Sequence, residues 1–171
     1  EVLPKVTATV RFDARNSLYA SVSKGYKAGG FNTQMFSEVQ QARLMKQMGV
    51  AMHRLSIDDI VAYKPEYSWN YEVGTRLSTS DHRFQADAAL FLIDTRDQQI
   101  ARFSEKGLGR MMVNAGRSRS HGAELTLRAQ PNPNLSFMAN YGYCHSEFRK
   151  YHDGQTDYTG NFVPFAPRHT V

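Results

Sequence analysis

Residues 69–77, WNYEVGTRL, alternate between two kinds of side chain at every second position. The odd positions, from Trp69 to Leu77, are aromatic, aliphatic or threonine, whereas the even positions include Glu72 and Arg76. Because successive side chains of a β-strand point to opposite faces, the pattern predicts a strand with one apolar and one charged face. Charged side chains rarely tolerate full burial, so we expect the charged face to meet water or polar protein.

The same alternation recurs along the chain, and turn-like stretches rich in polar residues, glycine or proline separate the runs. The further runs are residues 5–12, 18–26, 84–92, 122–129 and 135–144, and a last strand is expected to begin at 168–171. Sequential runs of this kind predict antiparallel hairpins, so we expect an all-β chain of about six or seven strands.

The predicted connections alternate in length. Short connections are expected at 13–17, 80–83 and 131–134, and long ones at 28–65, 103–111 and 149–166. This order is typical of an up-and-down transmembrane barrel, which has short periplasmic turns and long extracellular loops. In the first long loop, residues 37–50 place Val39, Ala42, Met45 and Met48 at three-residue spacing. This spacing predicts a short amphipathic helix that packs on the loop itself.

The aromatic residues of the apolar face favour lipid over a protein core as its neighbour. Trp69 and Tyr141 lie toward the predicted long loops, whereas Phe84 and Phe137 lie beside the short turns. Aromatic rings gather at both membrane–water interfaces in this way. No apolar run approaches the roughly 18 to 20 residues that a membrane-spanning helix needs, so a membrane crossing would have to use strands.

The composition gives no support for catalysis or a cofactor. The six histidines are scattered over different predicted strands and loops, and Cys144 is the single cysteine. Cys144 and His145 would point to opposite faces of a strand, so they do not form a nucleophile and base pair. The net charge of +5 suits an anionic partner or a solvated surface. We expect no enzyme activity, no catalytic residue, no metal, no cofactor and no nucleic-acid partner.

Five ordered motifs resemble the later barrel strands of TonB-dependent outer-membrane receptors, and the Bacteroidetes-like branch of iron-complex receptors is nearest in type. They are YASVSKGYKAGGFN (19–32), KPEYSWNYEVGTR (64–76), DQQI (97–100), NAGRSRSHGAELTL (114–127) and NFVPFAPRHT (161–170). The resemblance extends over essentially the whole chain. It implies a segment of a barrel of about 22 strands in the bacterial outer membrane, filled by a separate N-terminal plug domain. It also implies active uptake of a scarce ligand, such as an iron siderophore or a similar chelate, energised through TonB.

The two ends of the chain lead us to expect an internal piece of a larger receptor. The chain begins at Glu1 without a methionine or signal sequence, and it ends at Val171 without a turn. We expect residues 1–171 to be one partial barrel domain, with the plug domain and the closing C-terminal strand absent. TonB would then be reached through the missing N-terminal region.

The candidate ligand contacts lie where predicted strands enter the long loops. They are Tyr26, Lys27, Phe31 and Asn32 after the second strand, and Arg102 and Arg110 around the second long loop. Cationic and aromatic side chains suit an anionic, catechol-like iron chelate. The alternative is that GYKAGGFN is a structural strand-to-loop motif whose glycines permit unusual backbone angles.

Charged residues on the predicted strands suggest two further roles. Arg117 and Arg119 continue the outward face beyond the expected hydrocarbon edge, so we expect them to contact lipopolysaccharide phosphates beside the membrane lipid. On the opposite face, two inward glutamates are expected to pair with inward arginines or to contact the plug. The expected pairs are Glu72 with Arg76 and Glu124 with Arg128.

Two alternatives to a receptor share part of this pattern. A nonspecific porin or a barrel-borne adhesin would have the same alternation without a plug domain. A soluble β-sheet ligand-binding module would bury the apolar face inside a compact fold, although its strands would usually have only about 5 to 6 residues.

Overall fold

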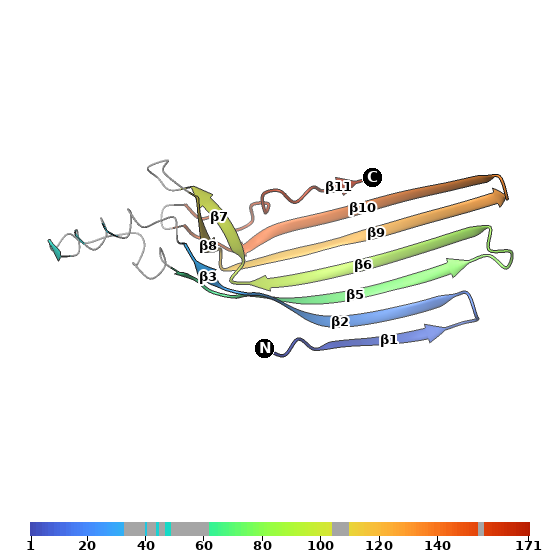
Figure 1. Cartoon of the computed structure of the whole chain (residues 1–171), viewed down its shortest axis with the longest axis horizontal. Coiled ribbons are helices and arrows are strands. Elements are labelled where there is room, and N and C mark those ends of the chain that lie inside the picture. The colour runs from blue at the N-terminus through green and yellow to red at the C-terminus, as the bar shows by residue number, and fades with distance from the viewer. Residues whose placement is uncertain (33–39, 41–43, 45–46, 49–61, 104–109, 154–155) are drawn as a thin grey trace.

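In the computed structural model, seven strands form one antiparallel sheet in the order β1-β2-β5-β6-β9-β10-β11 (Figure 1). The structure describes residues 1–32, 40, 44, 47–48, 62–103, 110–153 and 156–171. The strands are β1 (Lys5–Arg11), β2 (Ser17–Lys27), β5 (Glu66–Ser78), β6 (Phe84–Arg96), β9 (Arg117–Asn132), β10 (Leu135–Lys150) and β11 (His169–Thr170). The predicted all-β antiparallel architecture is confirmed.

Short and long connections alternate along this sheet as predicted. The tight turns after β1, β5 and β9 lie together at one end of the long strands (Figure 1). The opposite end carries two small antiparallel sheets, which pair β3 (Gly30–Phe31) with β4 (Ala62–Tyr63) and β7 (Gln99–Phe103) with β8 (Arg110–Asn114). We call these ends the turn end and the loop end.

Cross-strand pairing carries the apolar positions across the sheet in rows. One row consists of Ala20, Val73, Leu90, Ala123 and Tyr143, each opposite the next on the neighbouring strand. Val73 is 42% exposed and Leu90 is 60% exposed, so this face lies uncovered on the chain instead of forming a dry interior. Such a face is what contact with lipid requires.

The buried core lies at the loop end. Ala115, Phe148 and Tyr151 form its centre, and Ile100, Tyr158 and Val163 pack against them. The rings of Phe148 and Tyr151 are 5.0 Å apart, and the ring of Tyr158 stacks on Tyr151 at 5.2 Å. Aromatic contacts therefore anchor the chain that follows β10 onto the loop end of the sheet.

The predicted loop helix at 37–50 falls almost wholly outside the described residues. A hydrogen bond from the Met48 N–H to the Leu44 carbonyl, at 3.0 Å, has helical spacing. Among the described residues, no helix is long and apolar enough to span a bilayer.

Candidate functional site

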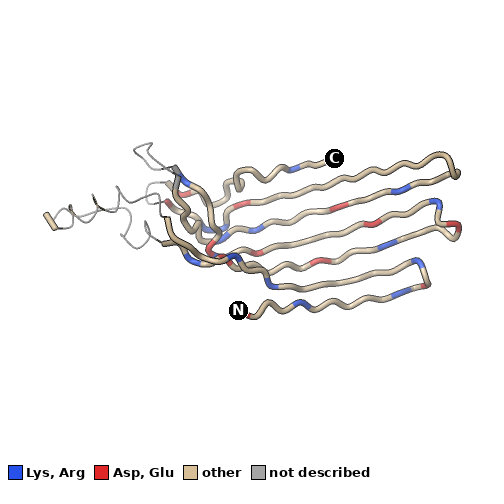
Figure 2. Tube along the Cα trace, in the orientation of Figure 1, with Lys and Arg blue, Asp and Glu red and all other residues tan. Residues whose placement is uncertain are grey.

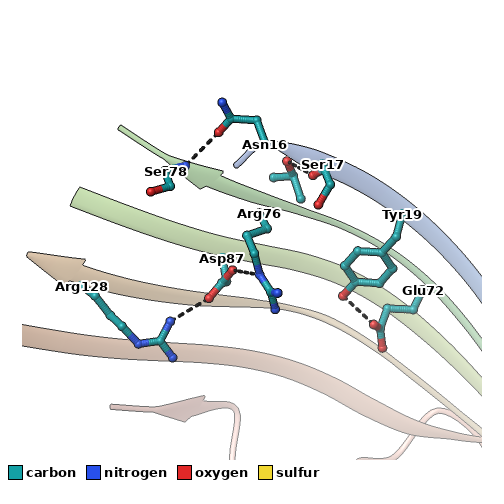
Figure 3. Close-up of polar contacts among 9 residues, drawn as sticks. Asn16, Ser17, Tyr19, Glu72, Arg76, Ser78, Asp87 and Arg128 are labelled. Atoms are coloured by element: carbon teal, nitrogen blue, oxygen red, sulfur yellow. Dashed lines mark hydrogen bonds and ion pairs between the residues drawn. The ribbon is translucent and has the colours of Figure 1, made fainter. Parts of the chain in front are cut away.

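The inward face of the sheet holds a network of polar side chains near the turn end (Figure 3). The Asp87 carboxylate lies between two guanidinium groups, and it accepts hydrogen bonds from Arg76 Nε at 3.0 Å and Arg128 Nη1 at 2.8 Å. Farther along the face, the Tyr19 hydroxyl donates a hydrogen bond to Glu72 at 2.7 Å. Tyr19, Arg76 and Asp87 line an open hollow of about 600 Å³, whose wall also includes Glu124.

The expected pairing of Glu72 with Arg76 and Glu124 with Arg128 is wrong. Arg76 and Arg128 share Asp87 instead, because Asp87 lies directly opposite Arg76 on the adjacent strand. Glu72 and Arg76 are four positions apart on one strand, which places them about 13 Å apart along its axis. Alternation identifies the face of each side chain, but the strand register decides its partner.

Two aromatic rings on the inward face lie over glycines of the adjacent strands. The ring of Tyr19 occupies the place that a side chain at Gly74 would need, because a Cβ there would lie 2.6 Å from the ring. Phe91 covers Gly122 in the same way, also at 2.6 Å. Phe91 interrupts the alternation of its strand, and these cross-strand pairs explain why an aromatic residue lies on the polar face.

The loop end contains the predicted ligand contacts, but it does not bring all of them onto one surface. Tyr26 lies on the outward face with Val22, and its ring is 5.4 Å from that of Tyr67, its cross-strand partner. Lys27 points to the opposite face and is exposed. Phe31 is 71% exposed on β3. Alternation along β2 therefore places Tyr26 and Lys27 on opposite faces, and the parity of the two positions already indicates this.

The polar candidates at the loop end are engaged within the chain. The Asn32 side-chain amide bonds both backbone groups of Met112, at 2.8 and 2.9 Å. Arg102 forms an ion pair with Asp153 at 3.4 Å and donates a hydrogen bond to the Asp153 carbonyl at 3.2 Å. Arg110 pairs with Phe103 through the β7–β8 ladder, and its side chain lies outside the described residues.

Two loop residues on the chain after β10 have shifted pKa values. Burial raises the pKa of the Tyr151 hydroxyl, in keeping with its place in the aromatic core. Hydrogen bonds from the Thr159 hydroxyl and backbone lower the pKa of Asp157. Asp157 is therefore ionised at neutral pH and adds negative charge to the loop end.

Within the described part of the chain, no group of three potential ligands is arranged to hold a metal ion.

Arg117 and Arg119 lie on the outward face at the loop end, as predicted. Asp94 accepts hydrogen bonds from Arg117 Nε at 2.8 Å and Nη2 at 2.6 Å, and from Arg119 Nη2 at 3.0 Å. Asp94 is opposite both Trp69 and Arg119, so this charged group lies in the same cross-strand row as Trp69. Charged positions occur along the long strands and at both of their ends (Figure 2).

Comparisons with known proteins agree with this geometry. The family model for the β-barrel of TonB-dependent receptor-like proteins matches residues 1–171. The pesticin receptor of Yersinia pestis is 30% identical over 169 residues, which are 99% of this chain and 21% of that receptor. The chain thus spans about a fifth of the length of this relative.

Solved structures show the same fold. The ferric yersiniabactin uptake receptor FyuA from Yersinia pestis superposes with a TM-score of 0.67 and 27% identity, over 99% of this chain and 22% of that one. The siderophore receptor PiuA from Acinetobacter baumannii superposes with a TM-score of 0.63 and 21% identity, over 96% and 22% of the two chains. The Bacteroidetes-like subdivision stays a prediction.

Uncovered apolar rows, a polar inner face and alternating connections are features of a lipid-embedded barrel wall. The match to the family model extends over the whole chain and decides against the porin, adhesin and soluble-module alternatives. The chain belongs to the TonB-dependent receptor β-barrel family, whose members are outer-membrane transport proteins of Gram-negative bacteria and not enzymes.

Proposed function

We propose that this chain is part of the wall of a receptor that takes up a ferric siderophore and is energised through TonB. The observation that carries the proposal is the similarity to the ferric yersiniabactin uptake receptor, at 27% identity and a TM-score of 0.67 over 99% of the chain. Residues 1–171 would form one partial barrel domain, and the plug domain and the TonB contact would come from the N-terminal part of the full receptor.

The loop end supplies the candidate ligand surface. Lys27 and Phe31 are exposed where β2 leads into β3, so a cation and an aromatic ring lie four positions apart. Such a pair suits an anionic chelate with aromatic groups. Asn32 and Arg102 support the surface through their bonds to Met112 and Asp153. Tyr26 points to the outward face, so we leave it out of the proposed contact set.

The inner wall supports the presence of a plug. Glu72 and Glu124 face the bore, and the side chain of Glu124 has no hydrogen bond or ion pair among the described residues. An ionised carboxylate in a filled barrel needs a polar or cationic partner. We propose that the plug domain supplies this partner.

Uptake of radioactive iron by the full-length receptor tests the function. The receptor is expressed in a receptor-deficient Gram-negative host and given ferric yersiniabactin as the probe. We expect uptake in the host and its loss when TonB is deleted. The double variant Lys27→Ala/Phe31→Ala should lower uptake at unchanged receptor abundance.

The matched control removes a phenylalanine and a cation at the turn end, in the double variant Phe12→Ala/Arg15→Ala. This control should retain wild-type uptake. Uptake that persists without TonB would contradict the proposed energy source, and absence of uptake by the wild type would contradict the proposed ligand.

We also propose that Arg117 and Arg119 contact the phosphates of lipopolysaccharide. Their side chains are 43% and 37% exposed, and both share the single carboxylate of Asp94. Asp94 holds both guanidinium groups beside each other on the outward face, where the outer-leaflet headgroups would lie. Planar guanidinium groups bind phosphate through two parallel hydrogen bonds.

Lipopolysaccharide that co-purifies with the full-length receptor measures this contact. The double variant Arg117→Gln/Arg119→Gln should carry less lipopolysaccharide per receptor than the wild type. The control Arg15→Gln/Arg83→Gln removes two arginines at the turn end and should leave the amount unchanged. Equal amounts in both double variants would remove the proposal.

A further inference from the structure

Two asparagines join the small sheets at the loop end in a reciprocal way. Asn32 follows β3, and its amide oxygen accepts the Met112 N–H at 2.8 Å while its amide nitrogen donates to the Met112 carbonyl at 2.9 Å. Asn114 ends β8, and its amide oxygen accepts the Lys64 N–H at 2.7 Å while its nitrogen donates to the Lys64 carbonyl at 3.0 Å. Each sheet therefore bonds the backbone of the other through one side chain.

Each asparagine side chain pairs with the N–H and the carbonyl of one residue, as a neighbouring strand does in a β-sheet. A primary amide has the same donor and acceptor as a peptide unit, so it pairs with both backbone groups of one residue. The partners are 80 and 50 positions apart in the chain, so the two bonds connect loops that are remote in sequence. Asn114 also donates to the Asp97 carbonyl at 2.7 Å, which ties its amide to the end of β6.

A buried glutamine adds a third connection between the same segments. Gln99, only 7% exposed, donates from its side-chain nitrogen to the carbonyls of Ala28 at 2.8 Å and Lys64 at 3.1 Å. Its backbone N–H donates to the Glu66 carboxylate at 2.7 Å. Because Gln99 itself is buried, its amide would be costly to leave without these partners. We call Asn32, Gln99 and Asn114 the amide clamp.

The clamp borders the proposed ligand surface. Lys27 and Ala28 precede β3, and Phe31 immediately precedes Asn32. A Cβ at Gly29 would be 2.5 Å from the Tyr63 carbonyl oxygen, so the chain just before β3 lies directly against the end of β4. The segment that carries Lys27 and Phe31 is thus held on one side by β4 and on the other by the clamp.

We propose that the amide clamp consists of positioning residues that couple the β3–β4 and β7–β8 sheets into one unit and fix the ligand surface on it. The proposal rests on the proposed function for its ligand, but the coupling itself does not depend on the ligand. A siderophore held by Lys27 and Phe31 would then affect β7–β8 through three side-chain amides.

Hydrogen–deuterium exchange of the full-length receptor in detergent tests the coupling without any ligand. Asn114→Ala should speed exchange roughly tenfold across β3 and β4, and Asn32→Ala should do the same across β7 and β8. Asn134→Ala is the matched control, because Asn134 lies in an exposed turn at the other end of the sheet. It should leave exchange at both small sheets unchanged.

Faster exchange confined to Met112 in Asn32→Ala and to Lys64 in Asn114→Ala would overturn the coupling, because it would show only the loss of a direct partner. The positioning role is tested by the dissociation constant of ferric yersiniabactin, which either substitution should raise roughly tenfold at unchanged receptor abundance. Unchanged affinity would overturn that role. If the wild type fails to bind ferric yersiniabactin, the proposed ligand is wrong, and the exchange result still decides the coupling.

Discussion

The two ends of the sheet are held together by different kinds of contact. At the turn end, Asp13 accepts the backbone N–H groups of Arg15 and Asn16 at 2.6 and 2.9 Å, and Asp81 accepts that of Arg83 at 3.1 Å. These bonds connect residues two or three positions apart. At the loop end, the clamp connects residues 17 to 80 positions apart. The turns themselves are organised by local bonds, and Asn16 joins two of them by accepting the Ser78 N–H at 2.8 Å, whereas the loop end is held mainly by long-range contacts.

The difference fits the separate roles that turns and ligand-binding loops have in a barrel transporter. A short turn only has to reverse the chain, and side chains that bond their own backbone do so without help from other segments. A ligand surface must hold side chains from several connections in fixed relative positions, which requires contacts between those connections. The comparison predicts that loop-end substitutions have larger and more distant effects than turn-end substitutions.

The largest effect is expected at Gly116, which has a φ of 62° and whose Cβ position would overlap the Lys150 carbonyl oxygen. Gly116→Ala should lower the free energy of unfolding by about 3 kcal/mol, because backbone strain and overpacking add. Gly160 has a φ of 85° with nothing within 4 Å, so Gly160→Ala should lose only about 1 kcal/mol. Denaturant unfolding of the full receptor in detergent measures both, and equal losses would contradict the role of the Lys150 contact.

A smaller effect is expected at Gln99. Gln99→Ala removes the hydrogen bonds to the Ala28 and Lys64 carbonyls, and at about 0.5–1.5 kcal/mol for each bond it should cost about 1–3 kcal/mol of unfolding free energy. Gln85→Ala is the control, because Gln85 is a half-buried strand residue outside the clamp, and it should cost less than about 0.5 kcal/mol. A loss as small as that of the control would show that the loop end does not depend on this amide.

The smallest effect is expected from pH at the turn end. Hydrogen bonds from the Thr79 hydroxyl and the Arg83 backbone lower the pKa of Asp81 below its ordinary value of 3.8. The stabilisation by this carboxylate is present above that ordinary value and is lost as pH falls through the lower folded pKa. Asp81→Asn should therefore flatten the dependence of the unfolding midpoint on pH below about pH 5, where the wild-type carboxylate begins to bind a proton in the unfolded state. An unchanged pH profile would contradict a contribution from this turn.

Sequence patterns were informative where structure follows from neighbouring residues. The short turns, the strands and the lipid-facing rows all follow from turn chemistry and alternation, and the outward position of Arg117 follows from the same parity. The parity of Tyr26 with Val22 was equally readable and places its ring on the outward face. The partner of Asp87 was not readable, because alternation leaves the register between strands open.

The sequence by itself determined that this chain is a lipid-facing sheet with a polar inner face, because side-chain alternation and turn residues act over a few positions. Only the tertiary structure decided which charges pair across the bore and which amides join the loops. Those contacts depend on strand register and on segments that meet after folding, so residues far apart in the chain, such as Asn32 and Met112, become partners.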